Sequence, residues 1–258
     1  MPSLYSSRQA RPKKRWWHIV QSLFFIFVFS LAAFIFLQSA VFSVREITVH
    51  GNKQLGAQDI ISLAGLRKDV NIFKTNLKEA RDKVALHPMV QNVEIRRDLP
   101  ASITIDLTER KALALISNGS SFLVISEDGC LLSSVTNLNS TNLPFITGVK
   151  ATPVGPGQKL LDTKLQIARD YLIGMPLSLR AAVSEINVSD LNNILVFTID
   201  RVEVRFGDDG RIAEKVKLYQ EVISRKYKDK IQYIDISYKG NPVIKFIQPQ
   251  QEEPGIGP

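Results

Sequence analysis

The chain has 258 residues, of which 45% are hydrophobic, and its formal charge is +8. Residues 1–18 contribute five of these positive charges and no acid, so the rest of the chain is only weakly basic, which argues against a binder of polyanions. Cys130 is the single cysteine, and this excludes an intrachain disulfide framework and a metal site built from several thiolates.

Residues 19–42 contain no charged side chain. As a helix this stretch would be roughly 36 Å long, enough to cross a hydrocarbon core of roughly 30 Å. A cleaved signal peptide is the alternative, but its apolar core usually spans only about 7–15 residues. Gln38 also stands two positions before Ala40, where a cleavage site needs a small residue. We therefore expect 19–42 to be a retained transmembrane helix that crosses the membrane once.

Residues 1–18 form a basic arm in front of this helix. Short segments rich in Lys and Arg stay cytoplasmic, and Trp16 and Trp17 follow the basic residues at the depth where indole rings sit among headgroups. A nucleic-acid-binding arm is the alternative, but beside an apolar helix such a run sets topology and attracts anionic lipid. We expect a cytoplasmic N-terminus, no nucleic-acid partner, and residues from 43 onward outside the cytoplasm.

The pattern over 43–111 predicts a small domain of three strands and two helices. Apolar residues alternate with polar ones in three runs, which predicts strands at 44–50, 90–97 and around 103–107. In two other runs apolar residues recur at helical spacing, which predicts helices at 59–66 and from 77 to shortly before Pro88. Asn76 is placed to cap the second helix, with Glu79 three residues later as in a capping box. A three-stranded sheet covered on one face by the two helices would bury every apolar face.

This order of segments resembles a POTRA module. The resemblance is carried by the residues at 44–52, 71–73, 87–90, 93–100, 103–105 and 109–110. A POTRA module directly after a single, basic-flanked membrane helix is similar to the FtsQ/DivIB family of bacterial division proteins. One departure lies at Lys111, where the family commonly has a proline, although the alternating strand pattern survives it. The resemblance implies the element order β-α-α-β-β for this domain and a role at the division septum. It also implies that the helix lies in the inner membrane and that the residues from 43 onward lie in the periplasm.

Residues 112–247 continue the resemblance as a mostly antiparallel β domain with flanking helices, so that the exported part as a whole is α+β. Strands are expected at 112–116, 122–125, 183–188, 194–199, 202–206, 234–238 and 242–247, and helices at 160–173 and 212–223. Asp208 and Asp209 lie between glycines, a pattern that is typical of a turn. A calcium-binding loop is not predicted, because no further acids follow at the spacing that such a loop needs. Residues 248–258 contain three prolines and predict a disordered tail.

No motif for catalysis is present. The three histidines, His18, His50 and His87, do not have a metal-binding spacing, and the nucleophile and phosphate-loop motifs of common enzymes are missing. Glu185 and Asp200 could in principle act as a carboxylate pair, but the sequence gives no sign that they converge. We therefore expect a protein that is not an enzyme, has no cofactor, metal or small-molecule substrate, and works by binding other proteins.

The strand predicted at 242–247 offers a binding mechanism. It begins with Pro242, which cannot donate a hydrogen bond into a central ladder, so we expect an edge strand that can accept an extended segment of a partner. The family resemblance implies the same region, where the C-terminal strands recruit small membrane partners of the FtsB and FtsL type. By this resemblance the partner-binding residues are Tyr238, Gly240, Val243, Ile244 and Phe246.

Several alternatives stay open at this point. Tyr238 and Phe246 could simply pack in the core, and Ser237 stands where the family often has a basic residue. The first strand, 44–50, and the second helix, 77–86, are candidates for a second binding surface in the POTRA part. Two rival functions are another POTRA-bearing chaperone or secretion component, and an anchored periplasmic hydrolase.

Overall fold

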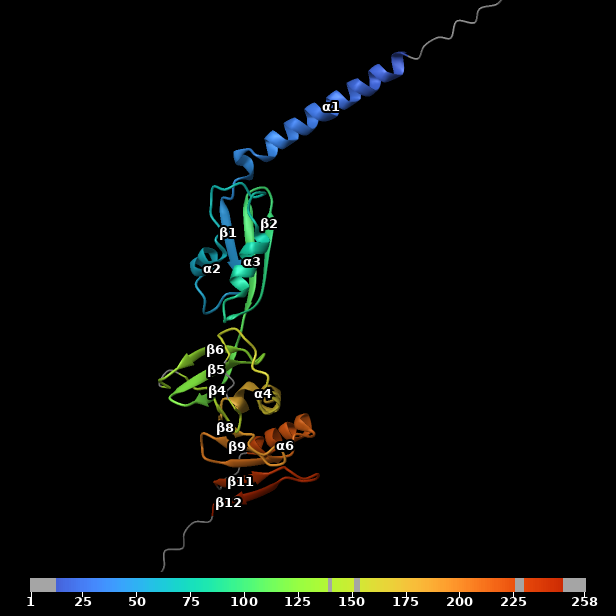
Figure 1. The fold of residues 1–258 in the computed structure, drawn as a ribbon. Coiled ribbons are helices and arrows are strands. Elements are labelled where there is room, and N and C mark those ends of the chain that lie inside the picture. Colours follow the sequence, from blue (N-terminus) through green and yellow to red (C-terminus); the bar gives the residue numbers. More distant parts are fainter. Residues whose placement is uncertain (1–12, 139–140, 151–153, 226–229, 248–258) are drawn as a thin grey trace, which may run out of the picture. The chain divides into compact units, whose positions relative to one another are not determined.

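A computed structural model describes residues 13–138, 141–150, 154–225 and 230–247 (Figure 1). The predicted basic arm up to residue 12 and the predicted tail at 248–258 lie outside the described residues. Helix α1, Lys13–Leu37, carries the long apolar stretch. Its segment Trp16–Leu37 has 22 residues and is long and apolar enough to cross a membrane. A short 3₁₀ turn, η1 at Ala40–Phe42, follows it, so the long helix ends at Leu37 and not at residue 42 as the sequence predicted.

The first sheet has three strands in the order β1-β3-β2, and β1 runs parallel to β3. Its elements are β1 (Glu46–His50), α2 (Ala57–Ala64), α3 (Leu77–Ala85), β2 (Val90–Asp98) and β3 (Ser102–Glu109). Ile103 and Ile105 of the central strand are fully buried, as the alternation along that strand predicts. This is the β-α-α-β-β order expected from the sequence.

The ends of the two helices in this part follow local rules. Asn76 Oδ1 accepts a hydrogen bond from the backbone N–H of Glu79 at 3.2 Å, and Asn76 Nδ2 donates to Glu79 Oε2 at 3.4 Å. The first of these bonds is the cap predicted for α3, and the second joins the two side chains. Gly65 caps the C-terminal end of helix α2, and its φ of 69° is left-handed, a conformation in which glycine carries no side-chain penalty.

The second sheet has nine strands in the order β12-β11-β10-β9-β8-β7-β4-β5-β6. Its strands are β4 (Ala112–Asn118), β5 (Ser121–Ser126), β6 (Leu131–Val135), β7 (Phe145–Thr147), β8 (Val183–Asn187), β9 (Ile194–Thr198), β10 (Glu203–Gly207), β11 (Ile231–Asp235) and β12 (Val243–Phe246), and its helices are α4 (Thr163–Gly174), α5 (Leu177–Arg180) and α6 (Ile212–Ser224). Five of the eight neighbouring pairs are antiparallel and three are parallel. The predicted α+β class with a mostly antiparallel sheet is therefore confirmed.

Some elements differ from the sequence-based expectation. Helix α4 begins at Thr163 rather than at residue 160, because the Asp162 side chain accepts a hydrogen bond from Leu165 N at 2.9 Å and caps the helix there. Strand β6, strand β7 and the single-turn helix α5 were not predicted. Strand β7 has only three residues, too few for a period-of-two pattern, yet it pairs in parallel with both β4 and β8.

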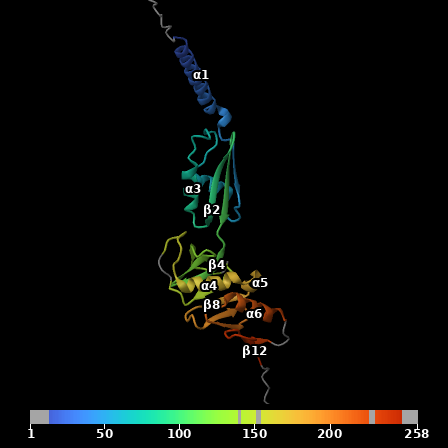
Figure 2. The same cartoon turned by 90° about the vertical axis from the view of Figure 1, so that its right-hand side faces the viewer.

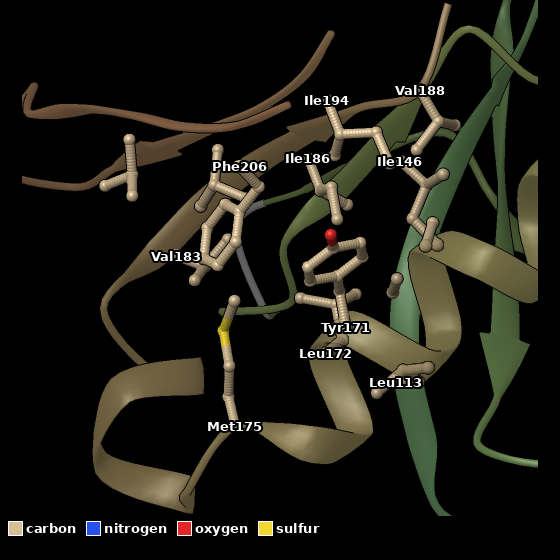
Figure 3. Close-up of a cluster of buried hydrophobic side chains, with 14 of the residues drawn as sticks. Leu113, Ile146, Tyr171, Leu172, Met175, Val183, Ile186, Val188, Ile194 and Phe206 are labelled. Atoms are coloured by element: carbon tan, nitrogen blue, oxygen red, sulfur yellow. The ribbon is translucent and has the colours of Figure 1, made fainter. Parts of the chain in front are cut away.

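The core lies between the nine-stranded sheet and the helices α4 and α6, which cover the same face of the sheet (Figure 2). In Figure 3 the Tyr171 and Leu172 side chains of α4 point toward the strands that carry Ile186 and Phe206. The Phe206 ring lies edge-on to Tyr171 at 4.9 Å and to Tyr219 of α6 at 5.9 Å. Both tyrosines are almost fully buried, so these three rings join the two helices to β10.

A polar clasp fixes the turn between β10 and α6. Lys215 is fully buried, and its amine donates to the backbone oxygen of Asp208 at 2.8 Å and to the Asp208 carboxylate. The Tyr171 hydroxyl donates to the same backbone oxygen at 2.9 Å. The two acids therefore belong to a turn, as predicted, and the Lys215 hydrogen bond holds the pKa of the Asp208 carboxyl below its usual range.

The clasp should contribute measurably to stability. Lys215→Ala removes two hydrogen bonds and leaves a cavity in the core, and we expect the free energy of unfolding to fall by about 2–4 kcal/mol. The measurement is thermal unfolding of the detergent-solubilised full-length protein, followed by circular dichroism. Lys217→Ala, on an exposed position of the same helix, is the matched control and should change the value by less than about 0.5 kcal/mol. Equal losses for the two variants would contradict the clasp.

The same interaction predicts a pH dependence. Because the folded-state pKa of Asp208 is lowered, its contribution is complete above about pH 4 and is lost as the pH falls through the lowered value. Asp208→Asn should therefore be less stable than the wild type at pH 7, and the difference should shrink toward pH 3. Thermal unfolding over this pH range measures it, with Asp209→Asn in the same turn as the control. A difference that is constant with pH would argue against an ionised Asp208 in the clasp.

Candidate functional site

Strand β12 forms one edge of the nine-stranded sheet, and among the described strands it pairs with β11 alone. Pro242 directly precedes it, so the prediction of a C-terminal edge strand is confirmed. The strand is short, at four residues, and its outer side carries backbone groups that no described strand takes up. Such an edge is a template for the addition of one more strand.

The register shows which backbone groups face the free side. Strands β11 and β12 are antiparallel, with Ile234 opposite Ile244 and Asp235 opposite Val243. The backbone N–H of Ile247 donates to Lys230 O at 2.8 Å, toward β11. Backbone donors alternate in direction along a strand, and the register shift lies in β11 rather than in β12. The N–H of Ile244 therefore points to the free edge.

The two faces of β12 differ. Ile244 is half-buried and packs against the core beneath the helices, whereas Val243 is 57% exposed. Lys245 shares the exposed face with Val243, and its amine lies 5.8 Å from the centre of the Tyr233 ring on β11. A partner strand at this edge would therefore meet a core-facing side and a solvent-facing side that is apolar and basic.

Three side chains on the solvent-facing side of β10 and β11 extend this surface. The Arg205 guanidinium lies 4.3 Å from the centre of the Tyr233 ring, a cation–π contact, and is held by Glu203 at 2.6 Å. The hydrogen bond to Glu203 raises the pKa of Arg205, which stays charged. The sequence did not predict this group, because alternation along each strand shows only that these side chains face outward. They come together only when the strands pair in the sheet.

Tyr238 does not lie on a strand, which corrects the sequence-based expectation. Strand β11 ends at Asp235, because the Asp235 carboxylate accepts hydrogen bonds from Ser237 N at 3.0 Å and Ser237 Oγ at 2.6 Å and turns the chain. Tyr238 therefore lies in the connection to β12 and is 79% exposed. Core packing, the alternative left open for Tyr238, is wrong.

The other predicted residues flank the same connection. Gly240 is exposed with a φ of 130°, a backbone conformation that other residues rarely adopt, and a side chain there would meet no atom within 4 Å. Phe246 is half-buried opposite Ile231, so it combines packing with partial exposure. All five predicted residues thus lie within the hairpin end formed by 236–246.

The described residues offer no comparable chemical site. No group of three or more His, Cys, Asp or Glu residues among them could hold a metal ion. Cys130 is buried, and burial together with the nearby Asp128 carboxylate raises the pKa of its thiol, which disfavours the reactive thiolate. The imidazole of His87 accepts a hydrogen bond from Met89 N at 3.2 Å within a turn, which is a structural role.

The faces of β12 predict a contrast in stability. Ile244→Ala removes half-buried packing and should lower the free energy of unfolding by about 1–2 kcal/mol. Val243→Ala changes an exposed side chain and should stay within about 0.5 kcal/mol of the wild type. Thermal unfolding by circular dichroism measures both variants. A larger loss for Val243→Ala would mean that the exposed face of β12 is covered within the protein itself.

Comparisons with known proteins match both parts of the chain. The family model for the POTRA domain, FtsQ-type, matches residues 42–110, and that for the cell division protein FtsQ/DivIB, C-terminal, matches residues 114–237. The cell division protein DivIB of Clostridium acetobutylicum is 29% identical over 215 residues, which cover 82% of this chain and 86% of that protein. The cell division protein FtsQ of Geotalea daltonii is 26% identical over 220 residues, covering 80% and 76%. The chain therefore belongs to the FtsQ/DivIB family of cell division proteins.

Proposed function

We propose that this protein is a non-enzymatic scaffold of the division machinery, and that its C-terminal edge strand recruits small membrane proteins of the FtsB and FtsL type. The observation that carries the proposal is the position of β12 at the edge of the nine-stranded sheet, with the Ile244 N–H directed outward. A partner segment that adds as a further strand gains affinity from backbone hydrogen bonds and selectivity from side chains at alternate positions. Membership in a cell-division family supports the setting.

The exposed residues around the edge have distinct roles in this proposal. Tyr238 is an aromatic anchor, because large exposed aromatic side chains bury much area at little conformational cost when a partner covers them. Gly240 lets the connection turn without a side chain in the path of the partner. Val243 and Lys245 meet the partner on the helix-free face, whereas Ile244 and Phe246 support the strand from the core side.

The proposal includes an orientation and a division of the chain. The basic residues of the arm 1–18 hold the N-terminus in the cytoplasm, the helical part of 19–42, which ends at Leu37, crosses the inner membrane, and the remainder lies in the periplasm at the septum. We assign 43–111 to the POTRA domain and 112–247 to the β domain. The POTRA domain supplies a second protein-binding surface, with β1 and α3 as its candidate elements. The scaffold thereby joins cytoplasmic and periplasmic division proteins without catalysing a reaction.

The edge-strand mechanism is tested by two variants at one position. Ile244→Pro and Ile244→Ala both lose the isoleucine packing, but only the proline variant loses the outward N–H. Full-length protein is co-expressed with FtsB-like and FtsL-like proteins from the same bacterium and purified from membranes. We expect the alanine variant to retain most of the capture and the proline variant to capture about tenfold less, since a lost backbone hydrogen bond and a clash with the added strand weaken the complex.

Circular dichroism of both variants checks that the fold survives, and the alanine variant is the matched control. Equal capture by the two folded variants would reject strand addition at this edge while leaving the partners in place. Failure of the wild type to capture either protein would reject the proposed partners.

A further inference from the structure

The end of the three-stranded sheet next to α1 carries exposed apolar side chains from three separate segments. Val41 is 46% exposed, Val70 is 39%, Phe73 is 44% and Leu99 is 59%. We call these four residues the apolar end. They belong to the turn after α1, the loop 67–75 between α2 and α3, and the turn between β2 and β3 (Figure 1).

Backbone hydrogen bonds bring the three segments together. Val44 N donates to Val70 O at 2.9 Å, and the next residue, Arg45, donates to Ala101 O at 2.8 Å. Ile72 N donates to Phe42 O at 2.8 Å. The loop 67–75 and the turn at 98–101 therefore lie directly beside the residues that follow the membrane helix.

The loop also contacts the helix end itself. Asn71 Nδ2 donates to the backbone oxygen of Leu37, the last residue of α1, at 2.8 Å, and so satisfies a carbonyl that a helix end leaves unpaired. The Phe42 ring lies 5.4 Å from that of Phe36 on α1 and 5.3 Å from that of Phe73 in the loop. An apolar path therefore runs without a break from the helix into the apolar end.

The length of α1 sets the depth of this contact. Trp17 and Leu37 are about 20 residues apart, which is roughly 30 Å along a helix and matches the thickness of a hydrocarbon core. With the tryptophans at one interface, Leu37 lies at the other. Residues within hydrogen-bond distance of Leu37 are then at the level of the lipid headgroups.

The charges around the apolar end suit a headgroup layer. The loop carries Arg67, Lys68 and Lys74, all exposed, against one acid, Asp69. Arg97 binds the loop from β2, donating to Ile72 O at 2.9 Å and to Thr75 O at 2.7 Å, so the loop is held in place. Basic side chains around an exposed apolar surface are the usual composition of segments that lie in the membrane interface.

We infer that the apolar end and the basic loop 67–75 lie in the headgroup layer of the outer leaflet, so that the POTRA part binds the membrane surface directly beside its own anchor. This inference rests on the membrane anchoring proposed above. The inference goes beyond anchoring, because the POTRA part itself binds the membrane surface in addition to the crossing of the membrane by α1.

The test uses full-length protein in vesicles of phosphatidylethanolamine and phosphatidylglycerol, with the natural thiol removed as Cys130→Ser. An environment-sensitive fluorophore is attached at Lys74→Cys in the loop, at Gln58→Cys on α2 as an exposed control, or at Phe27→Cys within α1. Lipids spin-labelled near the headgroup should quench the label at 74 about threefold more than the label at 58. Phe73→Ser should bring quenching at 74 close to the control level, whereas Leu63→Ser, of similar exposure on α2, should not.

The outcomes separate this inference from the anchoring on which it rests. Quenching at 27 by lipids labelled deep in the chain, with 74 no more quenched than 58, would overturn the membrane-contact surface and leave the anchor intact. No quenching at 27 would overturn both. Protection of 74 that needs added division proteins would identify a protein-binding surface instead. In phosphatidylcholine vesicles we expect weaker quenching at 74, and unchanged quenching would reject the role of the basic residues.

Discussion

The contact between the Lys215 amine and Asp208 determines where the edge strand lies. Strands β10 and β11 are parallel, so the chain must cross the sheet through α6, and the clasp fixes the start of that crossover. Tyr171 bonds the same backbone oxygen from α4, which ties the crossover to the second helix of the layer. Strand β11 then takes its place beside β10, and β12 beside β11. A loose turn at Asp208 would leave the final hairpin without a fixed neighbour.

An exposed edge is a liability as well as a template for a further strand, and β12 shows both sides of this balance. Its four residues, the preceding proline and the charge of Lys245 are features that limit pairing between copies of a protein. None of them removes the outward backbone groups at the centre of the strand. An edge of this kind disfavours indiscriminate addition of strands but accepts a segment whose side chains suit both faces. Selectivity then depends on the partner, because a four-residue ladder by itself provides few hydrogen bonds.

Local patterns predicted most of the fold from the sequence. The capping pair of Asn76 and Glu79, the buried alternation of β3 and the apolar stripe of α6 all follow from periods and short-range hydrogen bonds. Strand β7 could not be found this way, since its three residues are defined by parallel partners on both sides. Tyr238 continued an apolar alternation, but the side-chain bonds of Asp235 end that strand early. In the candidate surface, Pro242 predicted that the last strand lies at an edge. The contact between Tyr233 and Arg205 could not be predicted, because it depends on the pairing of β10 with β11.

The two surfaces differ in what they demand of their ligand. At the edge strand, backbone donors with fixed spacing require an extended segment, and a headgroup layer cannot supply one. At the apolar end, the exposed side chains come from three segments and follow no strand register, so an extended segment has no ladder to join. A fluid interface of mixed apolar and anionic groups needs no such register. The geometry of each surface therefore suits a different class of ligand, so the two proposed contacts do not call for the same kind of partner.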